Sequence, residues 1–170
     1  MEGSVNRWSW VVRITHWLVA VLFLANFTFV EDGTMAHEWV GYALVGLVLC
    51  RLLWGLVAPK HERLSSMKPS LSGAIGHIKD LLKTRRDDHQ GHNPAAVFMV
   101  WGLWCGIVLT GLSGWATTLS SAGWIEEGHE VIANGTALLA LVHIAAVIVM
   151  SKWTGNPYLS SMLAGKKLKN

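Results

Sequence analysis

The chain has 170 residues, 52% of them hydrophobic, with a mean hydropathy of +0.37 and a formal net charge of +3. This length predicts one domain, residues 1–170, and two cysteines exclude the disulfide framework of a small secreted protein. We expect no nucleic-acid partner.

Apolar residues are concentrated in four segments, at about residues 11–30, 39–57, 95–116 and 131–151. Each segment is about 20 residues long, which is enough to cross a hydrocarbon core of about 30 Å as a helix. The pattern predicts an all-α integral membrane protein with a four-helix bundle in a lipid bilayer. The first segment is too long for a signal-peptide core and lacks a following small-x-small cleavage site, so we expect it to be retained.

The connection between the second and third segments, residues 58–93, is too long to be featureless. Pro69 and Ser70 form a helix start signal. Apolar residues then recur at helical spacing, with mostly basic residues opposite them: Leu71, Ile75, Ile78 and Leu82 against His77, Lys79, Lys83 and Arg86. This pattern predicts a short amphipathic helix on the cytoplasmic membrane surface.

Charge predicts the orientation. All 14 Lys and Arg residues lie before or at the start of the first span, in the long connection, after the fourth span, or, for Arg51, near one end of the second. The short connections after spans one and three, with the adjoining helix starts, contain no Lys or Arg. Their charged residues are all acidic: Glu31, Asp32, Glu38, Glu126, Glu127 and Glu130. Positive residues stay in the cytoplasm, so both termini are expected there and the acidic connections on the opposite side.

Four of the eight histidines fall in or beside the spans: His16, His37, His129 and His143. Ionisable groups at membrane depth are costly and mostly functional, although a helix–helix hydrogen bond is an alternative. His37 and His129 each precede a span by two residues, so they share a level near the non-cytoplasmic face. His16 and His143 lie inside the cytoplasmic ends of their spans, at comparable depths.

His129 and His143 are 14 residues apart, which is nearly four helical turns. Their side chains therefore lie on the same face of the helix, separated by about 21 Å along its axis. One helix thus offers two ligands in two layers, His37 completing the outer layer and His16 the inner one. Structural zinc generally takes four ligands, whereas haem iron needs only two axial histidines. The spacing predicts two non-covalent b haems, each between two histidines, with a non-haem metal site as the alternative.

Three further residues are candidates around these layers. Arg51 lies 14 residues after His37, at the inner level, and Arg13 lies three residues before His16. Each arginine could meet a haem propionate or a quinone carbonyl; snorkelling to the interface is the alternative. Gly41, one turn after His37, would let a flat macrocycle approach the backbone. Small residues four apart in span three, Gly102 and Gly106, predict close helix packing.

Sequence motifs in every span carry a resemblance: RITHWLV in the first, HEWVGY and RLLWG in the second, GHNPAA before the third and HEVIANGTALLALVH in the fourth. Over nearly its whole length the chain resembles the prokaryotic cytochrome b561 family, related to the membrane cytochrome b subunit of nickel-iron hydrogenases. The resemblance implies a multi-pass inner-membrane cytochrome with two b haems, His16 pairing with His143 and His37 with His129. It also implies electron exchange with ubiquinone or another quinone. His92, in GHNP, is a candidate to line a quinone or propionate site.

Four functions fit these expectations. The first is electron transfer between membrane quinone and a periplasmic redox protein, such as a c-type cytochrome with a basic patch. The second is a superoxide:quinone oxidoreductase, and the third a haem anchor subunit of a hydrogenase or dehydrogenase. The fourth is a non-haem metal-binding membrane protein, such as a transporter. The acidic outer connections repel an anion and attract a basic protein, which favours the first. Homodimerisation is left open.

Overall fold

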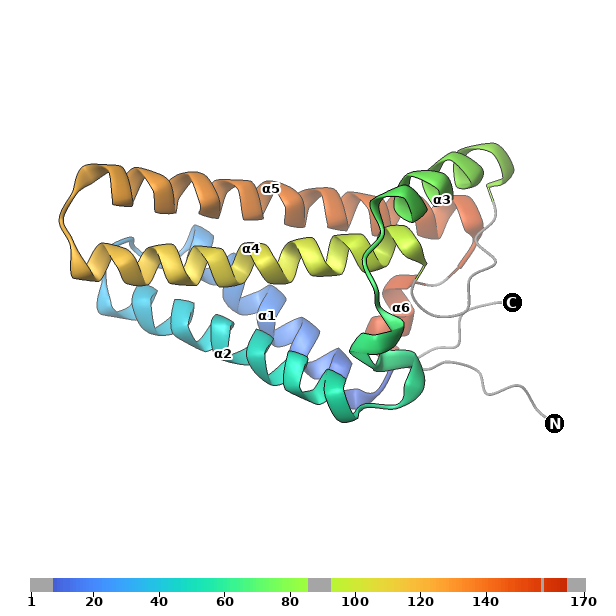
Figure 1. Cartoon of the computed structure of the whole chain (residues 1–170), viewed down its shortest axis with the longest axis horizontal. Helices are drawn as coiled ribbons and strands as arrows, with labels where there is room; N and C mark the ends of the chain where they lie inside the picture. The colour runs from blue at the N-terminus through green and yellow to red at the C-terminus, as the bar shows by residue number, and fades with distance from the viewer. Residues whose placement is uncertain (1–7, 86–92, 157, 165–170) are drawn as a thin grey trace. The chain divides into compact units, whose positions relative to one another are not determined.

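The computed structural model describes residues 8–85, 93–156 and 158–164. These residues form α-helices and short 3-10 turns and no strand, which confirms the all-α prediction (Figure 1). The elements in chain order are α1 (Trp10–Thr28), α2 (Met35–Val57), η1 (Lys60–Glu62), η2 (Leu64–Ser66), α3 (Leu71–Thr84), α4 (Pro94–Leu119), α5 (Gly123–Thr154) and α6 (Tyr158–Ala164).

Four of these helices, α1, α2, α4 and α5, are long and apolar enough to cross a membrane, as predicted. Large apolar side chains on them point away from the protein: Leu53, Leu138 and Leu141 are each more than 60% exposed. Such surfaces are costly in water and suited to lipid. The helix α5 begins eight residues before the predicted span and has 32 residues, or about 48 Å, so it is longer than the hydrocarbon core. The cytoplasmic location of the termini stays a prediction.

The chain divides into two compact units, which we describe separately. The first unit comprises residues 1–13, 54–101 and 142–170, and the second comprises residues 14–53 and 102–141. The helices α1, α2, α4 and α5 each contribute residues to both units.

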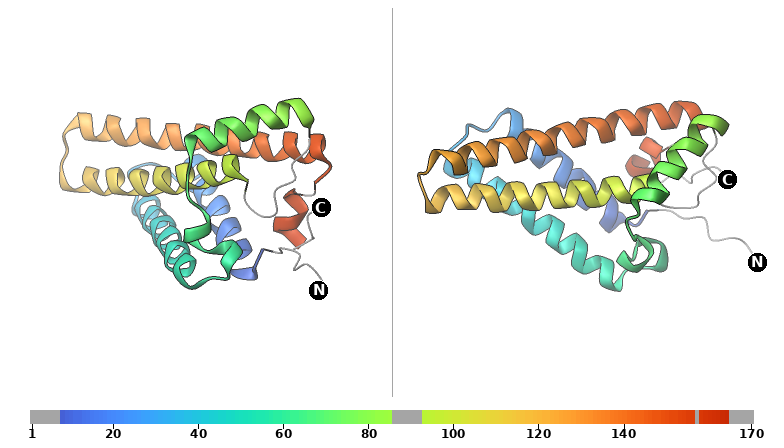
Figure 2. Two further views of the ribbon diagram at one scale, coloured as in Figure 1. Left: turned by 45° about the vertical axis from the view of Figure 1, so that its right-hand side comes forward. Right: turned by 45° about the horizontal axis from the view of Figure 1, so that its top comes forward.

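The second unit has an apolar core and one tight helix contact. Phe23, Leu44, Val48 and Ile107 form its buried cluster. Within this unit α4 and α5 run side by side (Figure 2), and a Cβ atom at Gly106 would lie only 2.8 Å from Thr136 Oγ1. A Cβ atom at Gly102 would lie 3.2 Å from Leu139 Cδ2. The close packing predicted for these two glycines is confirmed.

The first unit is organised around a fully buried carboxylate, Glu62. Its Oε1 accepts from the backbone N–H of Ser9 at 2.6 Å, and its Oε2 accepts from the Ser9 hydroxyl at 2.8 Å. The indole Nε1 of Trp54 lies 3.5 Å from the same Oε2. The carboxylate therefore joins the start of α1 to the segment that follows α2, and its charge lies at the N-terminal end of α1, where the helix dipole favours an anion.

Replacing Glu62 by alanine should destabilise the protein by about 1.5 to 3 kcal/mol, the usual range for hydrogen bonds to a charged group. The Ser9 donors would lose their buried acceptor. Reversible unfolding in mixed micelles, followed by circular dichroism, measures this change. Glu62→Gln keeps one oxygen acceptor and should lose less. Equal stability of Glu62→Ala and the unsubstituted protein would contradict the expectation.

The helix α3 matches the predicted amphipathic helix. Ser70 caps its start, accepting from the backbone N–H of Gly73, and Arg85 ends it in the left-handed region with φ 53°. The predicted apolar stripe is 46–59% exposed, and it comprises Leu71, Ile75, Ile78 and Leu82. His77, expected on the polar face, is instead buried with Ala74 and Leu81. The helix thus has one face packed on the protein and a second apolar face left open.

Candidate functional site

The second unit brings together two of the predicted histidines. His37 is in the first turn of α2, and His129 is in the second turn of α5. Both are partly buried, and their ring centroids lie 6.2 Å apart with the ring planes at 90°. These residues are 92 positions apart in the sequence, so the fold of the second unit creates their proximity.

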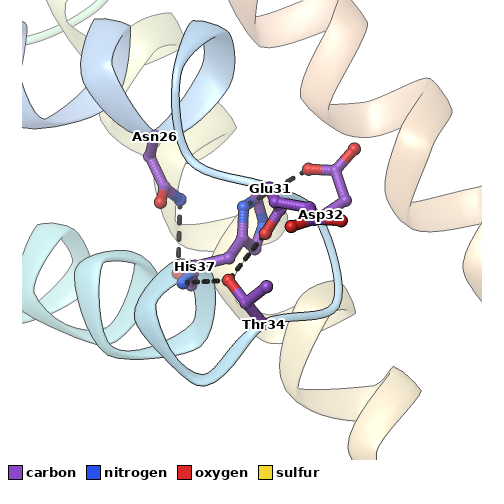
Figure 3. A network of polar contacts seen from close by, with 5 residues as sticks. All are labelled: Asn26, Glu31, Asp32, Thr34 and His37. Atoms are coloured by element: carbon purple, nitrogen blue, oxygen red, sulfur yellow. Dashed lines mark hydrogen bonds and ion pairs between the residues drawn. The ribbon is translucent and has the colours of Figure 1, made fainter.

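The loop before α2 holds the His37 backbone by a hydrogen bond and places a carboxylate beside its ring (Figure 3). The Thr34 hydroxyl accepts from the His37 backbone N–H at 3.3 Å and donates to the Glu31 carbonyl at 2.7 Å. The amide Nδ2 of Asn26 donates to the His37 carbonyl at 3.3 Å. On the ring, Nδ1 lies 3.3 Å from Asp32 Oδ1. This nitrogen makes no aligned hydrogen bond, but the negative charge beside it favours hydrogen on Nδ1 and a lone pair on Nε2.

A serine fixes the same tautomer in His129. Ser113 Oγ lies 3.1 Å from His129 Nδ1 and donates to the Thr110 carbonyl at 3.0 Å. A serine hydroxyl has a single hydrogen, so with that hydrogen on the carbonyl it accepts from Nδ1–H of the histidine. The Nε2 lone pair of His129 is therefore also free. Ring nitrogens that bind metals are held in this way, with the other nitrogen donating to a neighbouring oxygen.

The separation of the two ring centroids is close to that of two imidazoles bound to one metal ion. Histidine nitrogens bind metals at about 2.0–2.1 Å, so two imidazoles on opposite sides of one ion have ring centroids about 6.3 Å apart. The observed 6.2 Å agrees. Among the described residues no group of three or more His, Cys, Asp or Glu gathers as a metal site. Two protein ligands alone suit haem iron, because the porphyrin supplies the other four nitrogens.

Gly114 on α4 is closely packed against the His129 ring. A Cβ atom at this position would lie 3.0 Å from Cε1 and 3.4 Å from Nδ1. Such a contact is tighter than ordinary van der Waals contact, so any larger residue would push the imidazole away. Gly114 therefore lets α4 support the ring.

Gly114→Val should weaken retention of a haem on His129 about tenfold or more, the usual range for displacing a residue that supports a metal ligand. Haem content after purification, measured from the optical spectrum, tests this. Gly46→Val is a matched control, since a Cβ atom at Gly46 meets nothing within 4 Å. Equal haem content in both variants would count against a supporting role for Gly114.

The predicted inner residues are distributed over both units. His16 lies on α1 in the second unit, with its ring edge-on to Trp17 at 5.3 Å. His143 lies on α5 in the first unit and is partly buried. Their pairing therefore stays a prediction.

The other candidates have defined surroundings, except for His92, which lies outside the described residues. Arg51 is only 6% exposed, and its guanidinium lies 5.5 Å from the centroid of the Trp104 ring. Arg13 donates to the backbone carbonyls of Met162 and Leu163, at the C-terminal end of α6. A Cβ atom at Gly41 would meet nothing within 4 Å, so there is open space beside it.

Charge is segregated between the units. Within the second unit, the connections α1–α2 and α4–α5 lie at the same end of the helices (left in Figure 1). The His37–His129 contact joins the helices that follow these connections. The six acids named above lie in and beside these connections, and all except Glu38 are exposed; we call this surface the acidic end. The one cation of the second unit, Arg51, is buried. Every other described Lys and Arg belongs to the first unit.

Four residues of the histidine site were not identified as site residues from the sequence. Asp32 was identified only as a surface charge, although its position five residues before His37 was a usable signal. Ser113 and Gly114 gave no signal, because their role depends on which face of α4 meets α5. Asn26 donates a hydrogen bond to the His37 carbonyl and is buried. A polar amide within an apolar span was a signal that the sequence offered for this residue.

In comparisons with known proteins, the family model described as Prokaryotic cytochrome b561 matches residues 7–165. No curated protein and no solved structure matches the chain.

Proposed function

The chain belongs to the prokaryotic cytochrome b561 family and is a membrane haem b electron-transfer protein, and from this premise we propose that it carries two haems in series. One haem would be held by His37 and His129 and the other by His16 and His143. Electrons would pass between membrane quinone and a periplasmic redox protein. The protein would lie in a bacterial inner membrane with the acidic end on the periplasmic side.

The observation that carries this proposal is the geometry of His37 and His129. Each ring has Nδ1 within 3.3 Å of an oxygen, of Asp32 or of Ser113, which favours hydrogen on Nδ1 and a lone pair on Nε2. The ring centroids are 6.2 Å apart, close to the spacing of two imidazoles on one ion. A haem bound there would supply one-electron chemistry. The chain would favour the neutral tautomer with hydrogen on Nδ1 in both ligands, and it keeps both imidazoles partly buried in the second unit.

The buried cation supports an inner site. Arg51 is a cation that is only 6% exposed within an apolar span, where ionisable groups are mostly functional. Its guanidinium lies 5.5 Å from the centroid of the Trp104 ring. We assign Arg51 to a propionate of the inner haem or to a quinone carbonyl, and Gly41 to close approach of the outer macrocycle. Arg13, whose guanidinium binds the end of α6, and His92 remain secondary candidates for the quinone end.

Electrostatics support a protein partner over superoxide. The acidic end exposes five carboxylates and no described cation, so its field repels a small anion and concentrates a basic protein surface. This field favours a basic one-electron carrier, such as a c-type cytochrome, as the partner. A haem anchor role for a larger dehydrogenase or hydrogenase would instead require a catalytic subunit that co-purifies.

The test is the haem content and redox difference spectrum of the purified protein. We expect two b haems per chain, both reduced by a ubiquinol analogue and reoxidised by a basic c-type cytochrome. Absence of a b-haem α-band would refute the cytochrome proposal. Superoxide consumption at a rate near the diffusion limit would overturn the choice of partner and favour the superoxide:quinone alternative.

A further inference from the structure

We infer that Asp32 is a positioning residue that couples the acidic end to the outer haem: it holds a negative charge beside the His37 ring, lowers the potential of the haem on that ring, and releases part of this effect when a cationic partner docks. The inference rests on the proposed function, since it assumes a haem on His37 and His129. It goes beyond that function by assigning one carboxylate to both docking and redox control.

Asp32 touches the ligand and the solvent at the same time. Its Oδ1 lies 3.3 Å from His37 Nδ1, while 94% of its side chain is exposed. The His37 side chain is only 20% exposed. A molecule that approaches the acidic end can therefore reach Asp32 directly, whereas the ring behind it is largely covered.

The loop holds Asp32 in this position. Gly33, the next residue, has φ +72°, a left-handed conformation that suits glycine and reverses the chain between Asp32 and the start of α2. Thr34 then closes the turn, binding the Glu31 carbonyl on one side and the His37 backbone N–H on the other. The backbone on both sides of Asp32 is thus fixed relative to His37.

The effect on the haem follows from charge. A carboxylate beside the far nitrogen of an iron ligand makes the imidazole a stronger donor, and its negative charge stabilises the ferric form, which carries one more positive charge. The one-electron potential falls as a result. A lysine or arginine of a docked partner that pairs with Asp32 offsets this charge, so the potential of the outer haem would rise on docking and electron delivery to that haem would become more favourable.

Glu31 provides a matched control within the same loop. It precedes Asp32, is also exposed and carries the same charge, but the contact that ties it to the site uses its backbone carbonyl. Glu31→Gln therefore removes one charge from the acidic end without removing the carboxylate beside His37. Asp32→Asn removes both the charge and that carboxylate.

The experiment is a spectroscopic redox titration of the purified, haem-loaded protein and its variants. In Asp32→Asn we expect the ferric-to-ferrous ratio of one haem, at fixed potential, to fall about tenfold, which is about 59 mV for one electron. We expect a clearly smaller change in Glu31→Gln and near-recovery in Asp32→Glu. Equal shifts in Asp32→Asn and Glu31→Gln, or no shift in either, would overturn the inference and leave the proposed function standing. Lack of haem in the unsubstituted protein would refute the proposed function itself.

Two further outcomes complete the test. If Asp32→Asn loses the outer haem while Asp32→Glu and Glu31→Gln keep it, the positioning role is supported; loss in all three variants contradicts it. Short polylysine serves as the probe for a cationic partner. It should raise the potential of the outer haem in the unsubstituted protein and raise it less in Asp32→Asn. Equal responses would overturn the coupling.

Discussion

Replacing His37 by alanine is expected to leave the purified protein with one haem per chain in place of two. The outer iron would lose one of only two protein ligands, and among the described residues no group of three or more His, Cys, Asp or Glu gathers as a metal site to replace it. His129 would remain, held by Ser113, but a single imidazole binds less tightly than a pair on opposite faces. The optical spectrum and haem-to-protein ratio measure this directly, and the haem that is kept should have the spectrum of the inner site.

His143→Ala is expected to give the complementary result, with the inner haem lost and the outer one kept. The two variants together test whether the layers bind independently, because each should remove a different spectral component. His77→Ala serves as control: His77 is a buried histidine of α3 to which we assign no haem, so both haems should remain. Loss of both haems from either ligand variant would argue against independent layers, and loss from the control would indicate general instability.

The sequence predicted those features that depend on local pattern. Length and hydropathy determine which segments can cross a bilayer, and the four spans were found within a few residues except at the start of α5. That start was missed because the first turns of α5 carry Glu126, Glu127 and Glu130, which end an apolar run without ending a helix. The outer histidine pair could be predicted from depth, since both residues lie at the same end of their spans.

The residues that hold the histidines could not be predicted in the same way. Ser113 and Gly114 act on His129 through the contact between α4 and α5, and a sequence does not state which residues of two helices face each other. His77 on α3 illustrates the same limit of prediction from sequence. Helical spacing correctly predicted the apolar face of α3. The spacing could not show that the side with His77 packs on the protein, because that depends on what lies beside the helix.

Reversing two charges of the acidic end, Glu126→Lys with Glu127→Lys, should slow electron exchange with a basic c-type cytochrome about tenfold or more at low ionic strength. Both side chains are exposed, and neither contacts a histidine of the outer pair in the described structure. The change acts on the encounter, since charge complementarity raises association rates by about 10 to 10³. Stopped-flow mixing of the reduced protein with the oxidised carrier measures the rate.

Salt separates this mechanism from damage to the haem site. At 1 M salt the Debye length is about 3 Å, against about 10 Å at 0.1 M, so the difference between the double variant and the unsubstituted protein should nearly vanish. Asp80→Lys, which reverses an acid on α3 of the first unit, should leave the rate unchanged. A loss of rate that persists at high salt, or an equal loss in Asp80→Lys, would place the partner elsewhere. Charge reversal near the start of α5 also opposes the helix dipole, which destabilises the helix by about 0.3–1 kcal/mol per charge. The slower rate is therefore attributed to docking only if the double variant has the same haem content as the unsubstituted protein.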